Sequence, residues 1–193
     1  MHELESVLSE AARAWLDDIA LDDKLALLAA FSGAARRVGK TPVAVGERGM
    51  WGTDEVARAA LLVRAYPRLG PEELWAHGDN RERQAVLKAL PLLPEPARFE
   101  ALAIEACRAN VLTVFEAIAC ENPYPAQYFP ELHYNQMVLK AAFTDIRLAR
   151  IVGLRDRLNP ELARMAADFA AERRAAHRPV PDDLGLIMEG ASP

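Results

Sequence analysis

Apolar residues recur along this chain at spacings of three and four positions, the pattern of one face of an α-helix. The first such face carries Leu4, Val7, Leu8, Ala11 and Trp15. A second helix is predicted over residues 23–38, and because it is apolar on most sides around Leu25–Phe31 it is expected to be central in the core. Alanine and leucine are abundant, β-branched residues are sparse, and no alternating run is bounded by hairpin turns. The pattern therefore predicts an all-α fold.

Glycine and proline interrupt the helical pattern over residues 39–52, the longest stretch expected to be irregular. Within it, Met50 and Trp51 are expected to be exposed. Thr53 is predicted to cap the next helix, because its side-chain oxygen can accept a hydrogen bond from a first-turn amide. The two acidic residues that follow suit the positive end of that helix, which is expected to reach about Arg68.

Short helices separated by proline and asparagine fill the middle of the chain, and a longer one follows. Three of them are expected to start at Pro71, at Pro96 and at Asn159–Pro160. Two others are expected to cover Arg81–Leu93 and Val111–Cys120. Helices of this length joined by short turns pack antiparallel. We therefore expect helical hairpins stacked as in HEAT repeats, or an irregular helical bundle, in a single domain over residues 1–178. Residues 179–193 are expected to form an irregular tail, and its candidates for packing on the body are Leu184, Leu186, Ile187 and Met188.

Length and charge narrow the class of protein. With 193 residues the chain is long enough for a core that needs no disulfide or metal. Its net charge of −5 provides no positive field to attract nucleic acid or an anionic membrane. The N-terminus is acidic and amphipathic, unlike a secretory signal, and no window approaches the roughly 18 apolar residues of a spanning helix. The expectation is a cytoplasmic protein without membrane insertion or nucleic-acid binding.

Several segments resemble enzyme or metal-binding motifs, but each lacks a feature that the motif requires. Gly33–Thr41 is similar to a phosphate-binding loop, but five residues instead of four separate its glycines and a helix precedes it. Asp18 and Asp22 lie one helical turn apart, as magnesium-binding carboxylates do, but no partner set is visible. Cys107, Cys120 and the histidines lack zinc-ligand spacing, and no serine stands in a nucleophile elbow. We expect no catalytic residue, no metal and no cofactor.

A run of polar residues around two predicted helices is the candidate ligand-binding cluster. Its members are Glu116, Glu121, Asn122, Tyr124, Tyr128, His133, Gln136 and Lys140. Glu116 interrupts an otherwise apolar helix, where an ionised carboxylate needs a partner. Tyrosine, acidic, amide and basic side chains together suit a concave site for an aromatic or polar ligand. The alternative is structural, with carboxylates paired to basic residues and tyrosines bonded to backbone carbonyls.

The last long helix mixes charges of both signs at helical spacing. The candidate partner-binding residues on it are Arg164, Asp168, Glu172, Arg173 and Arg174. Arginine is favoured in protein interfaces, which supports a docking surface. The alternative is a solvent-exposed face whose charges pair with one another along the helix.

Four segments of the second half of the chain carry a family resemblance. They read ENPYP at residues 121–125, YFPEL at 128–132, NQMVLK at 135–140 and NPELARM at 159–165. In their order and amino-acid sequence they resemble the EboA family, and the resemblance is clearest from about Asn110 to Pro181. Members of that family are small bacterial proteins encoded beside membrane prenyltransferase-like and hydrolase-like neighbours, in clusters associated with moving metabolite precursors toward the periplasm.

The resemblance implies a non-catalytic accessory or scaffold protein of a secondary-metabolite cluster. Such a protein would act in processing or transport of a precursor by binding a partner protein encoded in the same cluster. The resemblance supplies no catalytic residues. The alternative is a protein or enzyme that binds a small metabolite, aromatic or isoprenoid-like, at the Glu116–Lys140 cluster.

Overall fold

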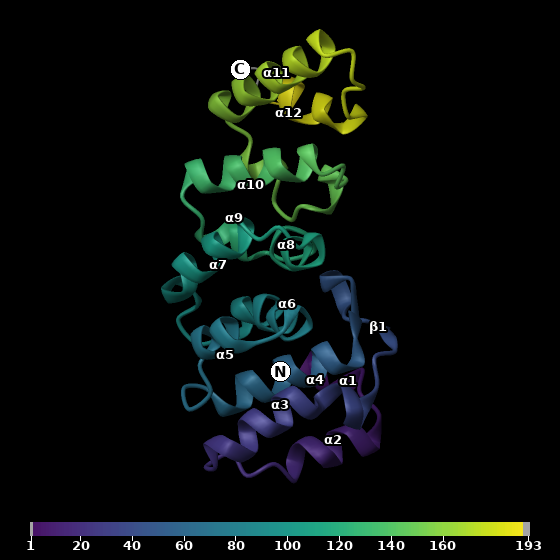
Figure 1. The fold of residues 1–193 in the computed structure, drawn as a ribbon, viewed down its shortest axis with the longest axis vertical. Coiled ribbons are helices and arrows are strands. Elements are labelled where there is room, and N and C mark those ends of the chain that lie inside the picture. The colour runs from purple at the N-terminus through teal and green to yellow at the C-terminus, as the bar shows by residue number, and fades with distance from the viewer. Residues whose placement is uncertain (1, 191–193) are drawn as a thin grey trace. The chain divides into compact units, whose positions relative to one another are not determined.

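The computed structural model describes residues 2–190, and these residues are predominantly α-helical (Figure 1). The all-α prediction is confirmed, with one small β-hairpin added. The chain divides into two compact units, Met1–Ile118 and Ala119–Pro193. The stacked-hairpin arrangement and the single domain over residues 1–178 stay predictions.

The first unit is built from the helices that precede residue 119 and the hairpin. Its helices are α1 (His2–Ser6), α2 (Glu10–Asp17), α3 (Lys24–Val38), α4 (Thr53–Ala65), α5 (Pro71–His77), α6 (Asn80–Ala89), α7 (Glu100–Cys107) and α8 (Leu112–Ala119). The strands are β1 (Pro42–Ala44) and β2 (Met50–Gly52), and the 3-10 turns are η1 (Gly46–Arg48), η2 (Leu90–Leu92) and η3 (Pro96–Phe99).

Helix α4, not α3, is the centre of this unit. It packs against α3 and α6, its two most extensive neighbours, and also against α1 (Figure 1). The prediction that residues 25–31 are central is wrong at Leu25, whose side chain is 78% exposed, whereas Leu27 and Phe31 are buried. The difference arises because α4 has a neighbour on each side, whereas part of α3 faces solvent. Small alanine side chains let the neighbouring helices approach α4 closely.

Residues 39–52 were expected to be irregular but contain the antiparallel hairpin of β1 and β2. Gly46 and Gly49 adopt φ angles of +49° and +74° in the connecting turn, a conformation that glycine takes without strain. Met50 is 62% exposed as expected, but Trp51 is only 3% exposed, because successive strand residues face opposite sides. Strands of three residues are too short for alternation to be recognised in the sequence.

Local capping signals set several helix ends. Asp23 begins α3 as predicted, and its side chain accepts hydrogen bonds from the first-turn amides. The prediction that Thr53 caps α4 is wrong, because Gly52 is the N-cap residue. The Thr53 hydroxyl donates to the Val38 carbonyl at 3.0 Å, and the Glu55 carboxylate accepts from the Gly52 amide at 2.7 Å. A tertiary contact to α3 therefore takes the hydroxyl away from its expected role.

The second unit contains four helices joined by 3-10 turns. They are α9 (Tyr124–Tyr128), α10 (Glu131–Phe143), α11 (Pro160–Ala175) and α12 (Gly185–Gly190), with η4 (Leu148–Arg150), η5 (Arg155–Arg157) and η6 (Asp182–Leu184). Helix α11 packs against α10 and α12. As predicted, Asn159 caps α11, and its side-chain oxygen accepts from the Leu162 amide at 2.8 Å.

The C-terminal segment is more ordered than its composition indicates. Where an irregular tail was expected over residues 179–193, residues 182–190 form η6 and α12; residues 191–193 lie outside the described part. Leu184 and Ile187 are fully buried, and α12 packs on α11. Burial of these apolar side chains outweighs the weak helix propensity of the segment.

Candidate functional site

The predicted ligand-binding residues lie in different environments. All except Glu116, which is half-buried on α8 in the first unit, belong to the second unit. Tyr124 and Asn122 are buried in the core, whereas Gln136 is exposed. His133 and Lys140 are half-buried on the same face of α10. The role of this cluster in ligand binding stays a prediction.

The aromatic members of the cluster form a packed corner at α9. The Tyr124 ring lies 4.8 Å from the Tyr128 ring and 6.3 Å from the Phe129 ring, measured between centroids. The Asn122 side-chain oxygen accepts a hydrogen bond from the Tyr124 amide at 3.0 Å, which closes the turn that begins α9. This corner is a rigid support for the segments that contact it.

Glu121 connects this corner to the segment between α10 and α11. Its carboxylate accepts two hydrogen bonds from the Arg150 guanidinium, at 2.7 and 3.0 Å. The Glu121 amide also donates to the Arg150 carbonyl at 2.9 Å. A bidentate arginine–carboxylate pair fixes direction as well as distance. The backbone of Arg150 is thus held in place by both the side chain and the main chain of Glu121.

Arg157 makes a second connection to the same corner. Its guanidinium donates to the Ala126 carbonyl at 2.7 Å and to the Phe129 carbonyl at 2.8 Å. It also lies over the Tyr134 ring, 4.5 Å from the ring centroid. The last carbonyls of a short helix lack partners within the helix, so a guanidinium there satisfies them.

Two further contacts complete the support of this segment. Asn135 on α10 and Asn159 before α11 exchange side-chain hydrogen bonds of 3.0 and 3.1 Å. The Asp183 carboxylate accepts a hydrogen bond from the Leu148 amide at 2.6 Å. Gly153, with φ of +70°, lies so close to α9 that a Cβ atom there would be 2.8 Å from the Ala126 methyl group. Only glycine satisfies both constraints.

The supported segment lines a pocket of about 900 Å³, which lies within the size range of small-molecule sites. Its lining residues are Leu148, Ala149, Ile151, Gly153, Leu154, Arg155, Asp156, Leu158 and Leu186. Most are apolar, and the two charged ones, Arg155 and Asp156, are exposed. We refer to residues 148–158 as the pocket segment. Part of the predicted cluster, Glu121 above all, holds this segment without itself lining the pocket.

The sequence-based prediction did not include the pocket residues. The segment lies between two predicted helices and has no periodic pattern that marks a site. One signal was available: arginine is unusually dense there for an acidic chain. The sequence indicates Leu186 only as a candidate for packing on the body, and its place in the pocket wall was not predicted.

Tyr134 lies behind this segment with a buried hydroxyl group that has no hydrogen-bond partner among the described residues. Burial raises the pKa of Tyr134 to about 12; the positive charge of Arg157 opposes this shift and the charge of Asp156 adds to it. The hydroxyl therefore stays protonated at neutral pH and is a donor.

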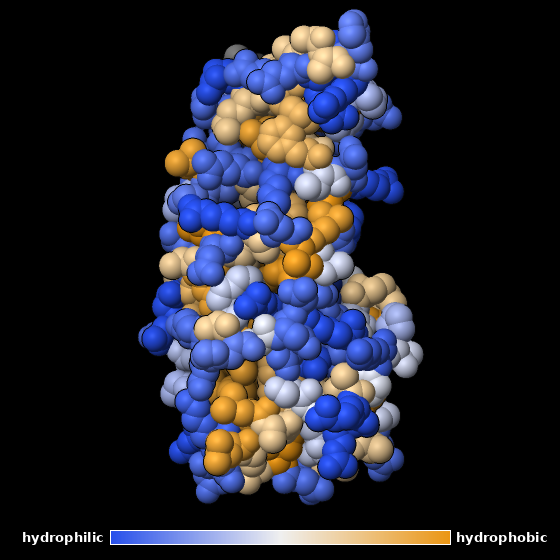
Figure 2. Space-filling model, in the orientation of Figure 1, coloured by the Kyte–Doolittle hydropathy of each residue, from blue (hydrophilic) through white to orange (hydrophobic). Residues whose placement is uncertain are grey.

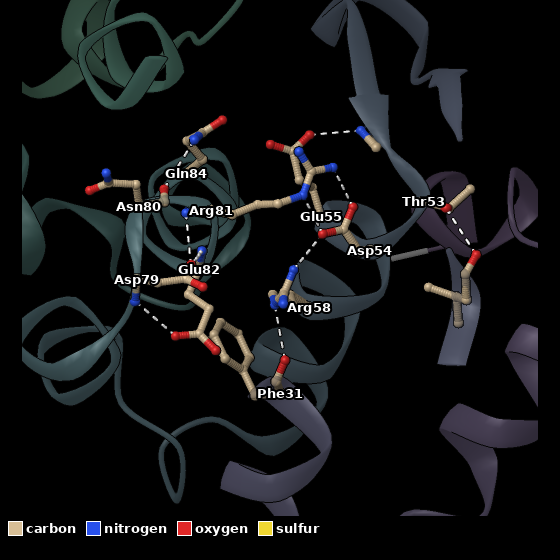
Figure 3. A network of polar contacts seen from close by, with 12 residues as sticks. Phe31, Thr53, Asp54, Glu55, Arg58, Asp79, Asn80, Arg81, Glu82 and Gln84 are labelled. Atoms are coloured by element: carbon tan, nitrogen blue, oxygen red, sulfur yellow. Dashed lines mark hydrogen bonds and ion pairs between the residues drawn. The ribbon is translucent and has the colours of Figure 1, made fainter. Parts of the chain in front are cut away.

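In the first unit, a network of buried charges joins α4 to α6 (Figure 3). Asp54 has no exposed surface, and Arg58 is 3% exposed. The Asp54 carboxylate accepts two hydrogen bonds from Arg81 and one from Arg58, each of 2.6 Å. Arg58 also donates to the Phe31 carbonyl of α3 at 2.9 Å. A buried charge is tolerated only when it is paired in this way.

The same network fixes the hairpin. The Glu55 carboxylate accepts hydrogen bonds from the Gly52 amide and from Lys88, whose ammonium group lies 5.2 Å from the centroid of the Trp51 ring. A Cβ atom at Gly52 would overlap the side chain of Arg81, so this position has no room for another residue. Burial by itself raises the pKa of an aspartate, but in Asp54 the hydrogen bonds and charges of the two arginines outweigh it and lower the pKa.

Both oxygens of Asp54 are engaged by guanidinium groups, so neither is available as a proton acceptor. The arrangement therefore acts as a structural clamp between three elements. From the sequence, Asp54 and Glu55 were interpreted only as residues that suit a helix start. The partners that explain their burial come from α6 and were not predicted.

The predicted partner-binding residues lie on α11, where part of the face pairs with itself. Arg164 donates to Glu161 at 2.6 and 2.9 Å and to Asp168 at 2.7 Å, all in exposed positions. The hydrogen bonds that Arg164 donates to the Glu161 carboxylate raise the pKa of Arg164. Arg173 instead donates to the Pro179 carbonyl at 2.7 Å. Glu172 and Arg174 are exposed. Docking at this face stays a prediction.

Two properties of the described residues bear on the kind of site. No group of three or more histidine, cysteine, aspartate or glutamate side chains in residues 4–188 is arranged to hold a metal ion. Within the same range, no helix has both the length and the apolar character needed to cross a bilayer.

Fold and site together define a predominantly α-helical protein with a ligand-sized pocket in its second unit. A family model described as "Metabolite traffic protein EboA" matches residues 1–189, and the chain belongs to this family. The match extends well beyond residues 110–181, where the resemblance is clearest in the sequence. No curated protein and no solved structure matches the chain.

Proposed function

We propose that this protein is a non-catalytic metabolite carrier that holds a small molecule in the pocket formed by the pocket segment and Leu186. The observation that supports this most is a pocket of about 900 Å³ whose wall is held by side-chain contacts on both sides. The family description, metabolite traffic, is consistent with binding and delivery. To act in transport, the protein must pass the bound small molecule to a partner protein, and we propose that this partner is encoded in the same cluster.

A wall that is already in place favours binding. The pocket segment has little regular structure and would lose conformational entropy if a ligand had to order it. Glu121, Arg157, Asp183 and the Asn135–Asn159 pair already order it without a ligand. Covering about 200 Å² of apolar ligand surface contributes roughly 5 kcal/mol before the entropy of association is subtracted.

The chemistry of the lining residues favours binding over catalysis. Among the described lining residues, only Arg155 and Asp156 are ionisable. The guanidinium group of arginine does not lose its proton near neutral pH, so it cannot act as an acid or a base there. An exposed aspartate with no second acid or base beside it in the pocket is weak support for proton-transfer chemistry.

The test uses Nile red, a neutral apolar dye whose fluorescence rises on binding. Leu186→Lys places a charge in the pocket wall, and we expect roughly tenfold weaker dye binding than in the wild type. Leu132→Lys is the matched control, because Leu132 is a similarly exposed leucine, 58% against 43%, that does not line the pocket. Circular dichroism confirms that both variants are folded. Equal dye binding by the two variants, or no binding by the wild type, would contradict the proposal.

Partner binding is the second candidate function, favoured by large apolar side chains that remain exposed. Figure 2 shows apolar patches that interrupt the polar surface. The exposed large apolar residues are Leu21, Leu25, Met50, Val111, Leu112, Leu132, Phe143, Val152 and Leu186. Single exposed apolar residues are common on monomers, so a partner has to be demonstrated. Co-expression with the cluster-encoded neighbours, followed by native mass spectrometry, tests for a complex directly; recovery of the monomer alone argues against it.

A further inference from the structure

The pocket segment and its two neighbours in sequence carry an excess of positive charge. Residues 147–159 contain four arginines and one aspartate, a formal charge of 4 − 1 = +3, in a chain whose net charge is −5. Two carboxylates from neighbouring elements contact this stretch, those of Glu121 and Asp183. Including them leaves 3 − 2 = +1. The surroundings of the pocket are thus positive in an otherwise acidic protein.

The four arginines differ in what they already bind. Arg150 is paired with the Glu121 carboxylate, and Arg157 donates to two backbone carbonyls. Carbonyl groups satisfy the donors of Arg157 but do not neutralise its charge. Arg155 lines the pocket, and its side chain makes no hydrogen bond or ion pair with residues 4–188, whose side chains the structure describes. Arg147 is equally unpaired in that range but does not line the pocket.

We propose that the ligand of this pocket has an apolar body and one anionic group, a carboxylate or a phosphate. Arg155 binds the anionic group at the rim, while Ala149, Leu158 and Leu186, the apolar lining residues that are not buried in the protein, contact the apolar body. This inference rests on the proposed function and narrows its ligand class. The planar guanidinium matches the oxygens of either anion with two parallel hydrogen bonds. Asp156, on the same rim, disfavours ligands that carry a larger negative charge.

The experiment compares three probes that share a dodecyl chain: dodecanoate, dodecyl phosphate and dodecanol. The two anionic probes are titrated below their micelle concentrations, and dodecanol below its solubility limit, against the Nile red complex of the full chain. In the wild type, we expect at least one anionic probe to displace the dye at a roughly tenfold lower concentration than dodecanol. The reason is that the anionic group forms charge-assisted hydrogen bonds with Arg155, which the hydroxyl of dodecanol cannot match. This preference decreases as salt is added, because the rim is exposed.

Two variants assign the effect to one side chain. Arg155→Gln is expected to bring the anionic probes to within about twofold of dodecanol, with dodecanol itself unchanged. Arg147→Gln, which removes the same charge outside the pocket, is expected to change every probe by less than about twofold. Preference for the carboxylate or for the phosphate alone still supports the inference and identifies the anion.

The outcomes separate this inference from the proposed function. If all three probes displace the dye equally and Arg155→Gln changes none of them, the anionic ligand class is wrong while the carrier role stands. If Nile red and all three probes fail to bind, the carrier role itself is wrong. An equal loss in Arg147→Gln and Arg155→Gln contradicts a rim contact, because it assigns the preference to overall charge.

Discussion

Asp54 shows most clearly how single residues are stabilised in this protein. Its carboxylate is completely buried, which by itself disfavours the charged form. Two guanidinium groups, from Arg58 and Arg81, reverse that preference and lower its pKa. The pairing is reciprocal, because the hydrogen bonds that Arg81 donates to Asp54 raise the pKa of Arg81. Both arginines depend on the same carboxylate, so removal of Asp54 leaves Arg58 and Arg81 without this partner.

Asp54→Asn is expected to destabilise the fold by roughly 3 kcal/mol, because it leaves the buried Arg58 without its counter-charge. The pKa of Asp54 is lower in the folded state than in the unfolded state. Its contribution is therefore complete at neutral pH and is lost as the pH falls through the folded pKa. Urea unfolding from neutral to acid pH measures both effects. Asp22→Asn, at an exposed aspartate, serves as control, and an equal loss in both variants would contradict the role of the network.

Tyr134→Phe tests the opposite situation, a buried polar group without a partner. Because the hydroxyl makes no hydrogen bond with the described residues, its removal is expected to change the free energy of unfolding by less than about 1 kcal/mol, or to increase it. Arg157 still contacts the ring. Chemical denaturation provides the measurement. A loss of roughly 2 kcal/mol or more would show that the hydroxyl is bonded in solution.

At the scale of elements, the pocket segment depends on its neighbours for its shape. It contains only short 3-10 turns, and its backbone is held by α9, α10 and the turn before α12. Of the residues that hold it, only Glu121 belongs to the polar cluster predicted from the sequence, and its partner Arg150 was not predicted. Helical spacing placed His133, Gln136 and Lys140 on one face of α10; it did not indicate that Glu121 binds a residue beyond α10.

Arg157→Met is expected to loosen this segment while leaving the first unit unchanged. The variant keeps much of the side-chain volume over Tyr134 but leaves the carbonyls of Ala126 and Phe129 without their donor. A lost hydrogen bond of this kind costs about 1–3 kcal/mol locally. Amide hydrogen exchange should therefore become faster in residues 148–158 but not in α4, with weaker Nile red binding. Unchanged exchange in the pocket segment would show that the other contacts suffice.

Considered as a whole, the molecule consists of two compact units with different polar features. The first contains the buried charge network, and the second contains the pocket with its positive surroundings. All three tryptophans, Trp15, Trp51 and Trp75, lie in the first unit. Intrinsic tryptophan fluorescence therefore reports on the first unit, whereas the pocket needs an added dye or a measurement of the whole chain.

Ligand binding to the folded state is expected to stabilise the protein by mass action. Dodecanoate at one hundred times its dissociation constant should raise the free energy of unfolding by about 2.7 kcal/mol. Thermal unfolding followed by far-ultraviolet circular dichroism checks this. The stabilisation should be absent from Leu186→Lys at the same concentration. A similar shift in both proteins would indicate binding away from the pocket.

The sequence by itself determined the features that depend on neighbours a few positions away. The helical class and the helix starts at Asp23 and Asn159 follow from spacing and side-chain type, and these predictions are confirmed. Where a distant contact competed, the local interpretation was wrong, as at Thr53, whose hydroxyl bonds to α3.

Only the tertiary structure decided the partners that are remote in sequence. Arg81 lies 27 positions from Asp54, and Arg150 lies 29 positions from Glu121. Leu186 reaches the pocket because α12 forms on α11, although its own composition is unfavourable for a helix. Periodicity specifies which face of a helix is apolar, but not which helix will cover it. The charge network and the pocket therefore depend on packing that no local pattern specifies.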